Sequence, residues 1–138
     1  MKGRKTLVSS LMAALLLVLA APAAAATYTL ADLDGNWDIY AHAYYEVNGA
    51  YHWGNFTVSD GVITGGAGSQ NSTPCDYRGN VQIAPDGTVT GNIAGTFEGG
   101  AFFYELLSGR MNPSKDTIFA NGHDHRFWMS IIFLVKTN

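Results

Sequence analysis

The sequence predicts an all-β protein, on two observations. Residues 27–138 are rich in Tyr, Phe, Trp, Val, Ile and Thr, which favour strands, and no window shows the apolar spacing of an amphipathic helix. Turn-forming residues interrupt this stretch seven times. Seven interruptions leave eight segments, the strand number of a small closed barrel. We therefore expect an eight-stranded antiparallel up-and-down barrel, a meander of sequential strands, with a two-sheet β-sandwich as the alternative.

Residues 1–26 have the three parts of a secretory signal peptide. Residues 1–5 are basic, residues 7–21 are apolar, and residues 24–26 are three alanines of the kind that a signal peptidase accepts. An uncleaved membrane anchor is the alternative, but the apolar stretch is shorter than the roughly 20 residues that a span needs. We expect cleavage after Ala26, which leaves residues 27–138 as a single secreted or periplasmic barrel domain.

The charge of the expected mature chain narrows its partners. Residues 1–26 hold three basic residues and no acidic one, so their removal changes the net charge from −3 to −6. An acidic chain without a basic cluster fits neither nucleic-acid binding nor docking on anionic lipid. We expect no membrane span in the mature chain, because no second apolar run is long enough for a helical span. Small ligands and protein partners stay open.

Cys75 is the only cysteine, so the chain forms no internal disulfide. It is either a small buried apolar side chain or an exposed thiol that pairs between chains. The stability of the domain must then come from its core.

The seven interruptions define the expected strands in chain order. Six are short turns, in which Gly, Asn and Asp tolerate a positive φ and Pro presets the first corner. They are Asn48-Gly49, Asp60-Gly61, Pro85-Asp86-Gly87, Glu98-Gly99-Gly100, Asn112-Pro113-Ser114 and Asn121-Gly122. The seventh is a longer polar loop, Gly65 to Pro74. The strands between them are expected at residues 37–47, 50–59, 62–68, 75–84, 88–97, 101–110, 116–120 and 126–136.

The first hairpin predicts which residues face the interior. A two-residue turn at Asn48-Gly49 places Val47 opposite Ala50. One face is then apolar and mostly small, as an interior requires: Ile39, Ala41, Ala43, Tyr45, Val47, Ala50, His52, Gly54, Phe56 and Val58. The other face is aromatic and polar: Tyr40, His42, Tyr44, Glu46, Tyr51, Trp53, Asn55 and Thr57. A slip of one residue would exchange the two faces.

Two further strand segments carry information about burial. The turn Pro85-Asp86-Gly87 pairs Ile83 with Val89, which turns Val81, Ile83, Val89 and Ile93 inward. The last strand is largely apolar on both faces, with Met129, Ile131, Phe133 and Val135 opposite Ser130, Ile132 and Leu134. That strand is therefore central or covered by a partner.

The two ends of the expected barrel differ in composition. Because turns of a meander alternate between ends, Trp37 shares one end with three ordinary turns, and residues 121–126 lie at the other. Those residues form the densest cluster of titratable groups in the mature chain. Loops carry binding on such scaffolds. We therefore expect a ligand site at this open end, formed by Tyr45, His52, His123, Asp124, His125 and Arg126.

A metal site at the same end is less well supported. His123 and His125 project to one side of an extended segment, and imidazole binds zinc or copper. Three or four ligands are needed, however, and the sequence offers no cysteine pair or third spaced histidine. His52 is better explained as a hydrogen-bonded histidine near the barrel end. We expect no metal and no cofactor.

No catalytic residue is indicated. The sequence has no nucleophile elbow, phosphate loop or zinc-protease helix. Glu105 lies between Phe103 and Leu107 on one face of its strand, and a structural hydrogen bond is its expected role. Non-catalytic binding is therefore preferred over enzyme activity.

Gly35-Asn36-Trp37 precedes the first expected strand. A Gly-x-Trp motif entering an eight-stranded meander resembles the calycin group, which comprises the avidin-like and lipocalin-like barrels. This resemblance implies that Trp37 plugs the closed end and that ligand enters at the other. The short loops also resemble exported barrel-shaped inhibitors of bacterial proteases and lysozymes, although those commonly carry a disulfide.

The aromatic side chains of the first hairpin suggest an interface. If Tyr40, Tyr44, Tyr51 and Trp53 point outward, they expose more aromatic surface than a lone soluble domain usually shows. Tyr and Trp are preferred anchors of protein interfaces, so this surface would serve a homo-oligomer, a protein partner or a lipid boundary. A transmembrane barrel is a rival, disfavoured by short polar strands and the lack of long loops.

Three functions follow from these observations. The first is an exported binding protein that holds a small or apolar ligand at the open end of the barrel. The second is a protein-binding module or enzyme inhibitor that uses the aromatic surface. The third is a barrel-pocket enzyme of cyclase or isomerase type. An internal cavity would favour the first, and a filled core with exposed aromatic side chains would favour the second.

Overall fold

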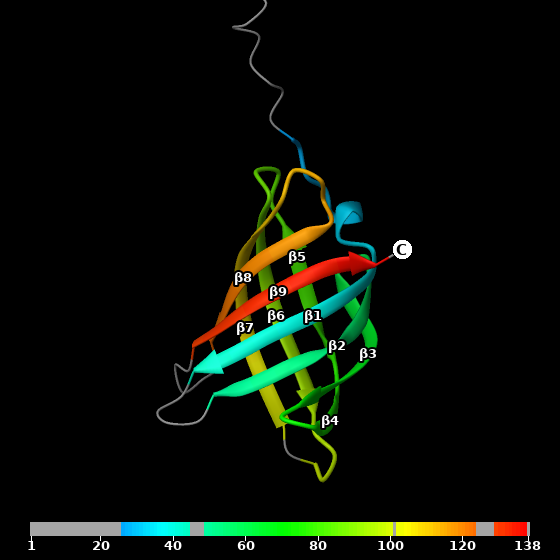
Figure 1. Cartoon of the computed structure of the whole chain (residues 1–138). Helices are drawn as coiled ribbons and strands as arrows, with labels where there is room; N and C mark the ends of the chain where they lie inside the picture. The colour runs from blue at the N-terminus through cyan, green and yellow to red at the C-terminus, as the bar shows by residue number, and fades with distance from the viewer. Residues whose placement is uncertain (1–25, 45–48, 101, 124–128, 138) are drawn as a thin grey trace, which may run out of the picture.

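A single antiparallel sheet closes on itself in the computed structural model, which describes residues 26–44, 49–100, 102–123 and 129–137 (Figure 1). A short 3-10 turn, η1 (Leu30–Asp32), precedes the sheet, and the described ranges contain no α-helix. The strands are β1 (Gly35–Tyr44), β2 (Ala50–Ser59), β3 (Val62–Gln70), β4 (Thr73–Asp76), β5 (Arg78–Ile83), β6 (Thr88–Thr96), β7 (Phe102–Met111), β8 (Thr117–His123) and β9 (Met129–Thr137).

The strand order confirms the predicted eight-stranded meander. Neighbours in the sheet follow the order β2-β1-β9-β8-β7-β6-β5-β3-β4, and a further β2–β3 pairing closes the barrel. One predicted strand, 75–84, is divided into β4 and β5. The barrel therefore has eight positions around its circumference and one extra strand.

A β-bulge explains the divided strand. Val58 lies opposite Ile63 and Thr57 opposite Gly65, so Thr64 is an extra residue on β3. On the other side of β3, Ala67 pairs with Asp76 of β4, whereas Ile63 pairs with Gly79 of β5. The same extra residue therefore shifts the register on both sides of β3, and the partner strand breaks at Tyr77.

The predicted loop from Gly65 to Pro74 is wrong. β3 continues to Gln70, and only Asn71 and Ser72 form the turn, both with positive φ (46° and 72°). This is the backbone of a two-residue hairpin turn. Gly68, one of the glycines that suggested a loop, is needed in the strand, because the Tyr77 ring packs where a Cβ on Gly68 would lie, as it does at Gly54 of β2.

The predicted turn at Asn121-Gly122 is also wrong. Both residues belong to β8, where Asn121 pairs with Ile131 and Gly122 with Ser130. A Cβ on Gly122 would overlap the carboxylate of Glu105. This glycine therefore permits the close approach of the partly buried Glu105 side chain and does not form a corner.

The predicted faces of the first hairpin are confirmed, although its register differs. Ala43, and not Val47, lies opposite Ala50, so the pairing is shifted by four residues. Because the shift is an even number of residues, the predicted inward side chains of the described parts of β1 and β2 still point inward. Ile39 and Phe56 are buried, whereas Tyr40 and Trp53 are 53% and 47% exposed.

The turn between β5 and β6 lies where the sequence predicts it, at Pro85-Asp86-Gly87. Ile83 pairs with Val89, and Val81, Val89 and Ile93 are buried, while Ile83 is partly buried against them. The backbone N–H of Ala84 donates to the Thr88 carbonyl at 2.8 Å, which closes this hairpin.

The segment before β1 covers one end of the barrel, next to the β5–β6 turn (Figure 1). The Tyr28 N–H donates to the Pro85 carbonyl, and the Lys115 ammonium donates to the Thr27 carbonyl from the turn after β7. Trp37 is 1% exposed beneath this segment, and its indole N–H donates to the Leu33 carbonyl at 2.7 Å. Trp37 is therefore a buried plug at this end.

Candidate functional site

Two small cavities lie among the buried side chains of the described barrel. A cavity of about 10 Å³ next to Trp37 is surrounded by apolar side chains. A second cavity of about 10 Å³ is lined by Ile39, Ala41, His52, Tyr77, Ile93, Glu105 and Ile132. Each volume is about that of a single water molecule. Neither of these two cavities therefore has room for an organic ligand.

The second cavity borders a buried polar cluster. The Ser130 hydroxyl donates to Glu105 Oε1 at 2.9 Å, which confirms the structural hydrogen bond expected for Glu105. The Tyr77 hydroxyl donates to the Trp53 carbonyl at 3.4 Å. Burial raises the pKa of Tyr77, with smaller contributions from Cys75 and from the charge of Glu105. The cluster therefore joins β7, β9 and the β4–β5 junction inside the barrel.

His52 and Cys75 are buried close to this cluster. His52 is 7% exposed, and burial lowers its pKa to about 4, so the imidazole is neutral at pH 7. Cys75 is 7% exposed, and burial raises the pKa of its thiol. Of the two alternatives that the sequence left open for Cys75, the structure therefore shows the buried apolar side chain.

The ligand site expected at the open end stays a prediction. His52 points into the barrel, whereas His123 is exposed on the outer side of β8, so the barrel wall separates them. Tyr45, Asp124, His125 and Arg126 lie outside the described residues. In the described ranges no group of three His, Cys, Asp or Glu side chains is placed to hold a metal ion.

The four predicted interface residues are all exposed, and they belong to a larger surface. It continues from β1 and β2 onto β9 and β8, which lie beside them in the sheet. We call this surface the outer aromatic face. Its nine large apolar side chains are 38% to 60% exposed: Tyr40, Tyr44, Tyr51, Trp53, Phe119, Met129, Ile131, Phe133 and Val135.

Cross-strand pairing forms rows across this face. Trp53 lies opposite Tyr40, Tyr40 opposite Phe133, and Phe133 opposite Phe119. The rings of Phe119 and Phe133 meet edge to face with centroids 4.9 Å apart. Such cross-strand aromatic pairs stabilise a sheet and here hold the rings in fixed positions.

A second row across the outer aromatic face has His42 at its centre. His42 lies opposite Tyr51 and Ile131, and its ring centroid is 4.4 Å from that of Tyr51 and 4.3 Å from that of Tyr44. Gly49 packs against the same imidazole, where a Cβ would overlap it. His42 is therefore held upright between aromatic rings.

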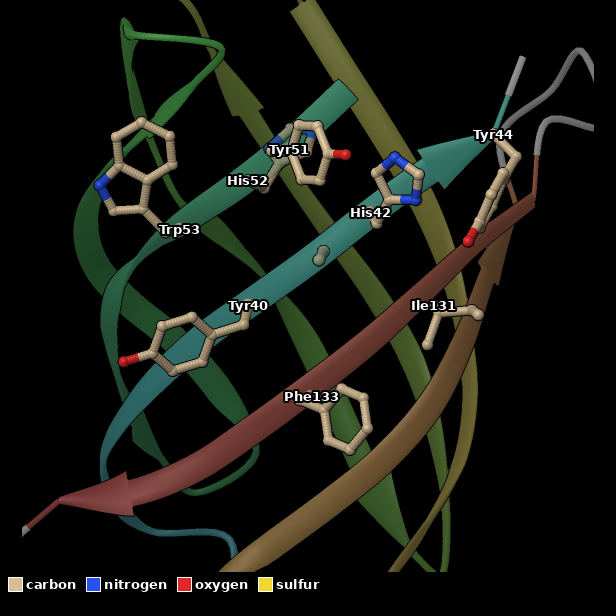
Figure 2. Close-up of a pocket in the computed structure, with 9 residues that line it drawn as sticks. Tyr40, His42, Tyr44, Tyr51, His52, Trp53, Ile131 and Phe133 are labelled. Carbon is tan, nitrogen blue, oxygen red and sulfur yellow. The ribbon is translucent and has the colours of Figure 1, made fainter. Parts of the chain in front are cut away.

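A groove of about 440 Å³ runs between these rows (Figure 2). Its lining consists of Tyr40, Ala41, His42, Tyr44, Tyr51, His52, Trp53, Ile131 and Phe133. Figure 2 shows the labelled aromatic rings standing on one side of β1 and β2, with His52 behind the wall. The groove is largely apolar, and the polar groups of its lining side chains are those of the histidines, the tyrosines and Trp53.

The sequence indicated only part of this face. The residues of β9 were recognisable as apolar on both sides of the strand, and closure of the predicted barrel implied that the last strand pairs with the first, but the sequence analysis did not join these residues to the aromatic side chains of β1 and β2. On the outward face of its short strand Phe119 has only Thr117 and Asn121 beside it, so its role depends on the pairing of β8 with β9. The contribution of β8 and β9 therefore comes from the topology.

Comparisons with known proteins assign no family. No family model matches the chain, and no curated protein matches it. Among solved structures, a de novo designed fluorescence-activating β-barrel is similar at 14% identity, with a TM-score of 0.49 over 83% of this chain and 97% of the design. The resemblance to the calycin group therefore stays a prediction.

Proposed function

We propose that the protein is an exported, non-catalytic binding protein whose partner docks on the outer aromatic face. One observation carries this proposal: nine large apolar side chains are exposed together on four neighbouring strands. At about 200 Å² for a fully accessible large side chain, their exposed fractions correspond to about 900 Å². The largest apolar patch of a typical monomer measures about 300–600 Å² and is often functional.

The small size of two internal cavities also favours the outside of the barrel as the binding surface. The two cavities each measure about 10 Å³, and Glu105, which lines one of them, accepts a hydrogen bond from Ser130. Export is supported by the composition of residues 1–26, which are basic, then apolar, then small.

A small apolar ligand in the groove is the second candidate. Its volume of about 440 Å³ is within the range of about 300–1,000 Å³ for small-molecule sites. The lining would select a flat apolar molecule with one hydrogen-bonding group, because His42 and the tyrosine hydroxyls supply the few polar contacts. The ligand site at the open end, the inhibitor role and the cyclase or isomerase activity remain hypotheses.

Native mass spectrometry of the protein purified from its own host tests the proposal. We expect the wild-type chain to carry a bound partner that the double variant Tyr40→Ser, Trp53→Ser loses. Both side chains are about half exposed, so their removal leaves the core intact. Thr90→Ser, on the outer side of β6, is the control and should keep the partner. A partner that remains bound to the double variant would contradict docking on the outer aromatic face.

A further inference from the structure

We infer that a second copy of this chain occupies the outer aromatic face, so that two barrels form a symmetric dimer through it. This inference rests on the proposed function and names its partner. Four observations support it: the extent of the face beyond the groove, its area, its lack of charge and the position of its polar residues.

The face extends beyond the groove. Phe119, Met129 and Val135 are 49%, 60% and 39% exposed, but they do not line the groove. A ligand that filled the groove would leave these three side chains in water. An occupant with a broad surface covers all nine side chains at once, and the surface of another protein meets that requirement.

The area of the face matches one side of a standard interface. Stable protein interfaces bury about 800 Å² on each partner. The nine side chains together expose roughly that area, from their printed fractions and about 200 Å² for each fully accessible side chain. In a symmetric dimer the same patch is buried on both copies, so one contact covers the whole face of each chain.

The charge distribution allows two copies to meet. The chain has 11 acidic and 8 basic residues, which would make two copies repel each other if the charges lay at the contact. At the outward positions of β1, β2, β8 and β9 in the described ranges, however, the only acidic or basic side chain besides His42 and His123 is Asp38. A strongly charged partner would find no complement here, whereas the same face on a second copy is equally uncharged.

Polar residues border the face, as they border protein interfaces. On β1 and β2 the pair Asp38 and Asn55 lies next to the row of Tyr40 and Trp53. On β7, Ser108 and Arg110 pair with Asn121 and Phe119 of β8. An apolar centre within a polar rim is the usual composition of an interface. The opposite wall differs, since Asn80, Gln82 and Thr90 point outward from β5 and β6.

The topology places the symmetry axis near β1 and β9. These two strands are the inner pair of the four that carry the face, and Tyr40 lies directly opposite Phe133 across them. Two such sheets stack about 10 Å apart with their side chains interdigitated. Every residue of a symmetric contact occurs twice, so a charge at position 133 would be buried twice in each dimer.

Sedimentation velocity of the full chain at micromolar concentrations tests the dimer. We expect the wild-type protein to sediment as a dimer and Phe133→Lys to weaken dimerisation by about 100-fold, because two lysine charges would be buried without partners. Thr90→Lys makes the same change on the polar wall and should remain a dimer. Circular dichroism establishes that each variant is folded, and Tyr40→Glu replaces Phe133→Lys if the latter fails to fold.

Each outcome decides the question. A wild-type monomer, or a dimer that survives both Phe133→Lys and Tyr40→Glu, overturns the inference. In a further outcome, the wild type is instead a monomer that carries a partner from its host, and the double variant Tyr40→Ser, Trp53→Ser loses that partner. This result overturns the dimer but keeps the proposed function. Binding of a monomer to phosphatidylcholine vesicles, abolished by Phe133→Lys, assigns a lipid surface in place of the second copy.

Discussion

At the scale of single residues, the buried side chain of His52 affects the stability of the barrel. Its side chain points into the barrel beside Glu105 and Tyr77 around a cavity of about 10 Å³. The sequence predicted its inward direction from the alternation of the first hairpin, and that prediction is confirmed. Its proposed role in binding at the open end stays a prediction, because the loops expected to accompany it lie outside the described residues.

Burial of His52 makes stability depend on pH. In the folded protein its pKa is about 4, compared with an ordinary value of 6.5 in the unfolded chain. Unfolding therefore takes up a proton between these pH values, and the free energy of unfolding falls as the pH is lowered from 6.5 to 4. The full shift corresponds to about 3 kcal/mol.

Denaturant unfolding at pH 7 and near pH 4.5 measures this effect. We expect His52→Gln to lose less stability than the wild type over this interval, since the glutamine takes up no proton. His123→Gln changes an exposed histidine and should retain the wild-type loss. An equal loss in the wild type and in His52→Gln would show that His52 does not titrate differently on folding.

At the level of elements, the contact between β2, β3 and the β4–β5 junction depends on glycines. Gly54 and Gly68 lie opposite each other, and the Tyr77 ring covers both. A Cβ on Gly54 would lie 2.5 Å from the Ala67 carbonyl oxygen, 2.6 Å from the Gly68 Cα and 2.8 Å from the Tyr77 ring. Two of these atoms belong to the backbone, so the strands themselves would have to move.

Gly54→Ala is therefore expected to destabilise the barrel by about 2 kcal/mol, a typical cost of overpacking. Gly65→Ala is the matched control, because a Cβ on Gly65 meets no atom within 4 Å. Its free energy of unfolding should be that of the wild type or slightly higher. Equal unfolding midpoints for the two variants would contradict the packing of Tyr77 on these glycines.

The same glycines show why some elements were predictable and others were not. Strand and turn residues alternate clearly around Pro85-Asp86-Gly87, and the predicted pairing of Ile83 with Val89 is confirmed. Gly65 to Pro74 and Asn121-Gly122 have the composition of turns but lie largely within strands. There glycine is required by a side chain from a distant element, and a local pattern cannot show that contact.

The whole molecule is a barrel with two unlike walls. β1, β2, β8 and β9 carry the outer aromatic face, and β5 and β6 carry polar side chains. The strand count and the short connections predicted the barrel itself. The two walls depend on the pairing of β1 with β9, which joins the beginning of the barrel to its end and brings the two apolar segments together.

A dimer through one wall makes thermal stability depend on concentration. Because dissociation accompanies unfolding, the unfolding temperature should rise with protein concentration in the wild type. Phe133→Lys should unfold at a temperature independent of concentration. Differential scanning calorimetry over a series of concentrations measures both, and a wild-type unfolding temperature that stays constant would contradict dimerisation.

Hydroxyl-radical footprinting tests most directly whether a partner covers the outer aromatic face. Tyr40, Trp53 and Met129 are each about half exposed or more in the isolated chain, whereas Met111 is buried and reports on unfolding. In the wild-type protein as isolated from its host, we expect slow modification of Tyr40, Trp53 and Met129. In Phe133→Lys these side chains should react several-fold faster, while Met111 stays protected. Equal, fast modification in both proteins would mean that nothing covers the face.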